Sequence, residues 1–286
     1  MVISWMDFSV ANSIKPFSLS LEKNDFLFLA GETCHAQLLR ALAGFLQEEC
    51  SSRDSIRIDG QRIKNREIFK SLLLPKNAAE SFPQHRTIGA FALDLSPGIT
   101  KKKLENHAAA YGIDKRILYN KPAKISHMDL QKISLWLCSL NASPVLFIEE
   151  PEGGFFEECR PYDFLQRLLR DGITNSIVYL ADKKENILQK ATVMQLCRAR
   201  IAVFCADRLV EEGEAAKILG NPVHSYTKDW IKFGSRRQIK NGALWQYCQL
   251  NCKEQNNCPV KQSMSSVMWD CESKGLHKVV CRGFFD

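Results

Sequence analysis

The sequence lacks a long apolar run, a leader-like start and a single run that gathers its lysines and arginines. Nowhere among its 286 residues do about 18 apolar residues follow one another, so we expect no membrane-spanning helix. No basic region precedes an apolar stretch near Met1, so we also expect no signal peptide. The net charge is +7, but lysines and arginines are spread along the chain, which favours a solvated surface over a nucleic-acid site. We therefore expect a cytosolic chain, or one docked onto a membrane protein, without a nucleic-acid partner.

The region around Gly31 has the frame of a phosphate-binding loop. The apolar segment Phe26–Ala30 runs into Gly31, and a helical pattern begins near Leu38. A working loop of this kind, G-x-x-x-x-G-K-[S/T], uses glycines so that backbone amides can surround phosphates, a lysine for the terminal phosphates and a hydroxyl for magnesium. The sequence therefore predicts a site for ATP and magnesium at Gly31, Glu32, Thr33, Cys34, His35, Ala36, Gln37 and Leu38.

The loop keeps the first glycine and replaces the other residues that contact phosphate. Cys34 and Ala36 stand where glycines are usual, Gln37 stands for the lysine and Leu38 for the hydroxyl. Losing the lysine removes a charge-assisted bond worth about 1.5–3 kcal/mol. A left-handed conformation at Cys34 or Ala36 would cost a further ~1–2 kcal/mol each. We expect nucleotide to bind weakly and the chain to hydrolyse ATP very poorly by itself.

A second element, the apolar segment Pro144–Ile148, ends in two carboxylates. In a Walker B strand, the first carboxylate supports magnesium and the next polarises the attacking water. Glu149 would take the first role, although it is one methylene longer than the usual aspartate, and Glu150 would take the second, catalytic role. The alternative is that these residues only end a strand.

Strand-like and helical segments alternate along the chain, which predicts an α/β fold with a mainly parallel sheet, of the P-loop NTPase type. A hairpin is expected at the end of the sheet, from Ile201–Cys205 and Arg208–Glu211 around a tight turn. The pattern weakens after Trp230, and we place a boundary near Phe233. The expected strands are Phe26–Ala30, Val145–Ile148 and Ser176–Leu180, and the expected helices are Leu38–Leu46, Leu104–Tyr111, Leu130–Leu140 and Tyr162–Leu169.

In this order, the two elements resemble those of the ATP-binding subunits of ABC transporters. The five-residue signature of that family, L-S-G-G-Q, falls on Ile125–Asp129, where Ser126 is kept and both glycines are replaced. The bulkier His127 and Met128 would obstruct the close approach of backbone to phosphate. The glutamine of the family falls at Pro75. The resemblance implies an ATP-binding domain at residues 1–233 with a helical subdomain at about 76–140.

The end of this domain resembles one group of ABC ATPases. The segments Glu211–Gly213 and Asn221–Thr227 resemble the E-x-G and N-P-x-H-P-Y-T motifs of peptide-importer ATPases, including the oligopeptide, dipeptide and Sap types. The resemblance implies a subunit that pairs with a second, more competent ATPase. It also implies docking on transmembrane permeases, peripherally, at the cytoplasmic face of the inner membrane.

Residues 234–286, which we call the tail, contain a cluster of cysteines. Such a cluster in a reducing compartment indicates a metal or iron–sulfur cluster before disulfides. Cys252 and Cys258 keep a spacing found in the peptide-importer relatives, but Ser265 stands at the third position, so Cys271 would replace it. Two alternatives are a vestigial thiol-rich tail and a stand-alone metal- or redox-sensing module. The expected ligands of an iron–sulfur cluster or zinc are Cys252, Cys258, Cys271 and Cys281.

Overall fold

The computed structural model places its elements in two units, residues 1–70 with 176–286 and residues 71–175, which we call the first and the second unit. No helix among the residues it describes is long and apolar enough to cross a membrane. The described residues are 2–10, 14–32, 35–44, 56–62, 72–77, 81–150, 161–181, 187, 198–205, 208–233, 269–270 and 277–279.

The first unit is built on strand β3 (Asp25–Glu32), which pairs in parallel with β8 (Thr174–Leu180) and β9 (Arg198–Cys205). Residues 26–30 of β3 are at most 1% exposed, so both faces of the strand are covered. A strand covered on both faces reads as a continuous apolar run rather than an alternating one. That property made Phe26–Ala30 recognisable in the sequence, and the predicted strand there is confirmed.

The predicted hairpin at the end of the sheet is also confirmed. Strand β10 (Arg208–Glu214) runs antiparallel to β9, with Arg208 opposite Cys205. Two short pieces of the tail continue the sheet, β12 (His277–Val279) against β10 and β11 (Trp269–Asp270) against β12. The rest of the tail lies outside the described residues.

An antiparallel sheet at the N-terminus was not predicted. Its strands are hydrogen-bonded in the order β2-β1-β4-β5, and large side chains of β1, including Trp5 and Phe8, are buried. The indole N–H of Trp5 donates to the carbonyl of Leu42 at 3.3 Å, which ties β1 to the last turn of helix α1 (His35–Leu42). These strands are β1 (Ile3–Val10), β2 (Ile14–Leu21), β4 (Ile56–Ile58) and β5 (Gln61–Arg62).

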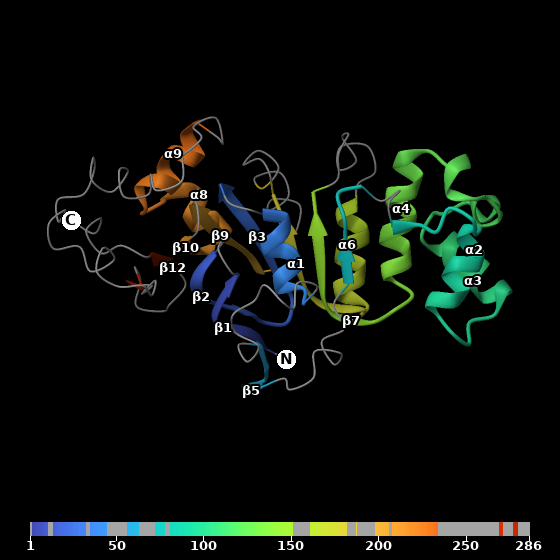
Figure 1. Cartoon of the computed structure of the whole chain (residues 1–286), viewed down its shortest axis with the longest axis horizontal. Helices are drawn as coiled ribbons and strands as arrows, with labels where there is room; N and C mark the ends of the chain where they lie inside the picture. The colour runs from blue at the N-terminus through green and yellow to red at the C-terminus, as the bar shows by residue number, and fades with distance from the viewer. Residues whose placement is uncertain are drawn as a thin grey trace, which may run out of the picture. The chain divides into compact units, whose positions relative to one another are not determined.

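The first unit closes with two helices after β10, α8 (Ala215–Gly220) and α9 (Ser225–Phe233), drawn in orange in Figure 1. Ile218 of α8 and Trp230 of α9 are both buried. Helix α9 ends at Phe233, the last described residue before β11, and the domain boundary placed near Phe233 stays a prediction.

The second unit contains a parallel pair of strands and a group of helices. β6 (Leu72–Leu74) pairs with β7 (Ser143–Glu149). The helices α2, α3 and α4, drawn in green shades in Figure 1, share one apolar core around Ile88, Leu104 and Trp136. Each begins at a Ser or Thr whose hydroxyl accepts a backbone amide of the first turn, the usual N-cap geometry. Their bounds, with those of the other helices, are α2 (Ile88–Leu95), α3 (Lys101–Ala110), η3 (Lys115–Tyr119), η4 (Pro122–Lys124), α4 (His127–Cys138) and α6 (Pro161–Arg170).

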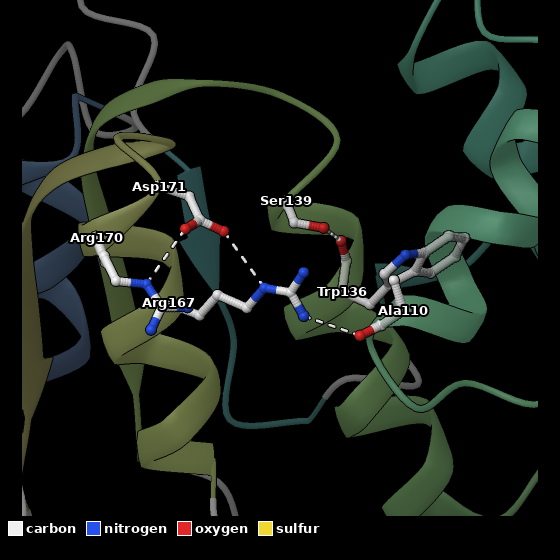
Figure 2. Close-up of polar contacts among 6 residues, drawn as sticks. All are labelled: Ala110, Trp136, Ser139, Arg167, Arg170 and Asp171. Carbon is white, nitrogen blue, oxygen red and sulfur yellow. Dashed lines mark hydrogen bonds and ion pairs between the residues drawn. The ribbon is translucent and has the colours of Figure 1, made fainter.

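Arginine 167 of α6 holds α3 and α6 together inside the second unit (Figure 2). Its guanidinium donates to the carbonyl of Ala110, the last residue of α3, at 2.8 Å. It also lies 4.1 Å from the ring centroid of Tyr111 and donates to Asp171 at 3.3 Å. A cation at the C-terminal end of a helix stabilises carbonyls that have no partner within the helix.

Candidate nucleotide-binding site

Gly31 lies in β3, directly opposite Phe204 of β9. Its φ is +100°, a backbone conformation that L side chains rarely adopt, and a Cβ at this position would lie 2.0 Å from the carbonyl oxygen of Phe204. The glycine is therefore required by the close approach of two strands, whether or not a phosphate binds nearby.

The start of α1 carries the residues that replace the lysine and the hydroxyl of a working loop. Gln37 is half-buried, and Leu38 has no exposed surface. Leu38 has no oxygen to offer and is part of the core, so no ligand to magnesium is available at its position. Ala36 is exposed. Thr33, Cys34 and the side chains of Glu32 and His35 lie outside the described residues.

These side chains do not fit magnesium-ATP in the way a working loop does. The ammonium group and the hydroxyl of that loop are replaced by a neutral amide and a buried alkyl group. The lysine of a working loop brings a positive charge to the phosphates, whereas the Gln37 amide can donate hydrogen bonds but brings no charge. What the described part of the loop retains is its frame, a buried strand followed by a helix.

Glu149 ends β7 and its carboxylate is already engaged within the second unit. The residue is 5% exposed, and its Oε2 accepts a hydrogen bond from the backbone N–H of Lys76 at 3.0 Å. Lys76 follows Pro75, which stands at the position of the glutamine in the family that the sequence resembles. The structure thus brings two predicted site elements together, although nothing in the sequence pattern indicated that they contact each other. Glu150 follows the end of β7 and is half-buried.

Ser126, the residue kept from the signature, is the N-cap of α4. Its hydroxyl accepts the backbone N–H of Asp129 at 3.1 Å and donates to the Asp129 carboxylate at 2.7 Å. These two bonds satisfy one backbone donor of the first helical turn, and such caps stabilise a helix by about 1 kcal/mol. A helix-capping role explains the retention of this serine without a bound phosphate.

The segment Asn221–Thr227, which pointed to peptide importers, forms an internal clamp. Both oxygens of the buried Glu211 carboxylate accept backbone amides, Oε1 from Val223 at 2.8 Å and Oε2 from His224 at 3.1 Å. The Nδ1 atom of His224 accepts the backbone N–H of Tyr226 at 3.1 Å. Burial lowers the pKa of His224 to about 4, so the imidazole is neutral at pH 7 and can act as that acceptor. The clamp sets where α9 begins.

A buried ion cluster joins the strands of the first unit. Arg200 of β9 donates to the carboxylate of Asp25 in β3 at 2.8 Å, to that of Glu212 in β10, and to the carbonyl of Ser20 in β2 at 2.6 Å. Asp25 has no exposed surface and Glu212 is 3% exposed. Breaking a buried pair of this kind on one side leaves an uncompensated charge, so each member depends on the others.

The predicted metal ligands Cys252, Cys258, Cys271 and Cys281 lie outside the described residues. Among the residues that are described, no group of three or more His, Cys, Asp or Glu side chains is placed to hold a metal ion. Cys138 and Cys205 are buried free thiols, as expected for cysteines in an apolar core. Burial raises the pKa of Cys138 to about 12, so its thiol is protonated at neutral pH.

Comparison with known proteins supports a distant relationship to ABC ATP-binding subunits. No protein-family model matches the chain. The spermidine/putrescine import ATP-binding protein PotA of Bacillus cereus is 25% identical over 244 residues, which cover 80% of this chain and 69% of PotA. A bacterial Atm1-family ABC exporter with ATP bound aligns with a TM-score of 0.57 at 15% sequence identity. That alignment covers 81% of this chain but only 42% of the exporter chain, so this protein spans less than half of the exporter's length.

Proposed function

We propose that this chain, a distant homologue of ABC transporter ATP-binding subunits with the α/β fold of that group, is a degenerate nucleotide-binding subunit. In this proposal it binds magnesium-ATP weakly and does not hydrolyse it alone. It pairs with a second, catalytically competent ABC ATPase and couples that partner to membrane permeases. It would lie peripherally at the cytoplasmic face of the inner membrane.

One observation carries the proposal: Leu38, at the position of the magnesium-binding hydroxyl, is fully buried. A substitution at an exposed position could be compensated by a neighbouring side chain or by water. The buried Leu38 of α1 leaves no room for a compensating side chain or water molecule. Gln37, which replaces the lysine, and Glu149, whose carboxylate accepts the Lys76 amide, support the same conclusion.

We also propose that the transported cargo is a peptide. It is supported by the segments Glu211–Gly213 and Asn221–Thr227, which resemble peptide-importer ATPases. The bonds from the Val223 and His224 backbone amides give a physical reason for the glutamate of that motif, and the bond from the Tyr226 amide to the imidazole gives one for the histidine. The name of the similar B. cereus protein refers to polyamines instead, so the cargo must be tested on the assembled transporter.

The nucleotide part of the proposal is tested by calorimetric titration of the purified chain with magnesium-ATP. Restoring the lysine as Gln37→Lys adds back a charge-assisted bond worth about 1.5–3 kcal/mol, a gain of roughly tenfold to a hundredfold in affinity. Gln37→Met has a similar length without the charge and is the matched control. We expect weak binding by the wild type, tighter binding by Gln37→Lys and no gain for Gln37→Met.

Two results would contradict this part of the proposal. One is micromolar binding of magnesium-ATP by the wild type that Gln37→Lys leaves unchanged. The other is steady ATP turnover by the isolated chain that disappears in Glu150→Gln, since that would make Glu150 a working catalytic residue.

The partner part of the proposal is tested separately, by purifying the tagged full chain from detergent-solubilised membranes of its own host. We expect a second ABC ATPase with an intact loop lysine, together with permease subunits. If repeated purifications, with chemical crosslinking before lysis, recover neither, the transporter assignment is wrong even if the nucleotide measurements hold.

The four-thiolate site in the tail is also a proposal. Cys252, Cys258, Cys271 and Cys281 provide enough ligands for a cubane iron–sulfur cluster or for zinc. Anaerobic purification followed by metal analysis tests it, with Cys138→Ser as the control for a buried cysteine outside the tail. Stoichiometric iron in a chain that never co-purifies with a permease would instead favour a stand-alone metal- or redox-sensing module.

A further inference from the structure

Residues 101–124 of the second unit hold most of the net positive charge of the chain. Seven cations stand against two carboxylates, Glu105 and Asp114, a net charge of +5 out of +7 for the whole chain. All seven cationic residues are exposed. We call them the basic surface; its members are Lys101, Lys102, Lys103, Lys115, Arg116, Lys121 and Lys124.

The fold brings together parts of this segment that are separate in sequence. Lys101, in the first turn of α3, lies with its Nζ 4.7 Å from the centroid of the Tyr119 ring at the end of η3. The Tyr119 hydroxyl donates to Glu105, one turn further along α3. Because residues three apart share a face of a 3₁₀ helix, Arg116 lies on the same side of η3 as Tyr119. The next short helix, η4, begins at Pro122 and ends at Lys124.

The positive charge of the basic surface is poorly compensated by the protein itself. Glu105 is engaged by Tyr119, and Asp114 pairs with Arg116 at 2.6 Å. Within the described part of the chain, no ion pair involves Lys102, Lys103, Lys115, Lys121 or Lys124.

Three lysines also stand in the first turn of α3, which contains no acidic residue. The N-terminal end of a helix is the positive end of its dipole, so cations there are unfavourable and anions are favoured. This arrangement therefore lowers the stability of the isolated protein while it raises the local positive potential. An anionic partner would offset both the unfavourable position of these lysines at the helix end and the repulsion among the cations.

We propose that the basic surface contacts anionic phospholipid headgroups of a membrane. Six of its seven cations are lysines, whose compact charges suit dispersed headgroups and whose alkyl stems can lie along an interface. Tyr119, whose ring lies beside Lys101, is 52% exposed, and tyrosine is enriched where membrane and water meet. A single lysine near an anionic leaflet strengthens binding about fivefold, so several acting together give useful affinity.

Nucleic acid fits this surface less well. Binding of single strands relies on aromatic rings that are free to stack on bases. The ring of Tyr119 is covered on one face by Lys101 and its hydroxyl is bonded to Glu105. Among the described residues, the other exposed large apolar side chains are Val2 and Met6, neither of them aromatic.

The test is sedimentation of the full chain with vesicles of phosphatidylcholine alone or with one-quarter phosphatidylglycerol. We expect binding only to the anionic vesicles, and loss of that binding at high salt, because exposed charges are then screened. The variant Lys102→Gln, Lys103→Gln, Lys121→Gln and Lys124→Gln should bind at least ~10-fold more weakly. The same four positions changed to arginine should keep binding, since the charge is retained.

The matched control removes the same charge from exposed lysines of the first unit, as Lys15→Gln, Lys23→Gln, Lys228→Gln and Lys232→Gln. It should sediment like the wild type. Equal losses in both quadruple variants would overturn the proposal, because only the total charge would then matter. The absence of any preference for anionic vesicles would also overturn it. A third contrary result is binding of single-stranded RNA that depends on Lys102 and Lys103, together with no binding to vesicles. These measurements need neither nucleotide nor permease, so their failure leaves the proposed function untouched.

Discussion

Replacing Gly31 by alanine should destabilise the first unit strongly, although this glycine was first noticed as part of a phosphate-binding frame. The structure assigns this glycine a role in the sheet, because a Cβ would lie 2.0 Å from the carbonyl oxygen of Phe204. Real Cβ atoms essentially never approach a heavy atom within 3.0 Å, so the two strands must separate by about 1 Å.

The magnitude has two parts. A positive φ, here +100°, costs a residue with a Cβ about 1–2 kcal/mol. Overpacking against a neighbouring backbone costs typically 1–3 kcal/mol. The free energy of unfolding should therefore fall by about 2–5 kcal/mol, which for a protein of this size lowers the midpoint of thermal unfolding by roughly 10 °C.

The assay is urea unfolding of the wild type and of two variants, followed by circular dichroism. Gly60→Ala is the matched control, because Gly60 also has a positive φ, +79°, but nothing lies within 4 Å of its added Cβ. Gly60→Ala should lose only the conformational part, about 1–2 kcal/mol. Equal losses in both variants would refute the steric explanation. Unchanged stability in Gly31→Ala, with altered nucleotide binding alone, would show that the glycine serves the ligand after all.

Three further predictions concern the buried polar contacts. The pKa of His224 is about 4 in the folded chain and about 6.5 in the unfolded chain. The contribution of His224 to the free energy of unfolding is therefore fully present above pH 6.5 and falls by about 3 kcal/mol as the pH drops towards 4. His224→Asn keeps an acceptor for the Tyr226 amide and should flatten this pH dependence in urea titrations at several pH values. Glu211→Ala leaves two backbone amides without their acceptor and should lower the free energy of unfolding by about 2–4 kcal/mol, whereas an unchanged urea midpoint would show that the clamp does not hold α9. Glu149→Ala should cost about 1–3 kcal/mol by removing the acceptor of the Lys76 amide, and Glu149→Gln should cost less because its carbonyl can still accept; equal effects in thermal unfolding would contradict this.

Elements with strong local signals could be predicted from the sequence. The run Phe26–Ala30 and the segment Val145–Ile148 are continuous apolar stretches, the pattern of strands covered on both faces, and β3 and β7 occupy these positions. The tight turn after Cys205 predicted the β9–β10 hairpin. The N-terminal sheet was not predicted, since its strands are stabilised by partners far away in sequence, such as Trp5 of β1 with Leu42 of α1.

Candidate site residues could be located but their contacts could not. The sequence placed Ser126 just before the expected helix Leu130–Leu140; the helix begins earlier, at His127, and the Ser126 hydroxyl caps it through Asp129. The hydrogen bond between Glu149 and the Lys76 amide joins residues 73 positions apart, and no spacing rule indicates such a pair. Motif reading recognises which residue types are present, whereas hydrogen bonding depends on which backbone groups the fold leaves nearby.

The sequence by itself predicted the frame of a nucleotide-binding fold and the loss of the side chains that bind phosphate and magnesium in such a frame. Both predictions rest on residue identity, namely a glycine after an apolar strand, then glutamine and leucine in place of lysine and hydroxyl. Only the tertiary structure decided what the remaining residues do. Gly31 lets β3 approach β9, where close packing leaves no room for an added methyl group. Leu38 of α1 lies in the buried core, where an unpaired polar atom would be unfavourable.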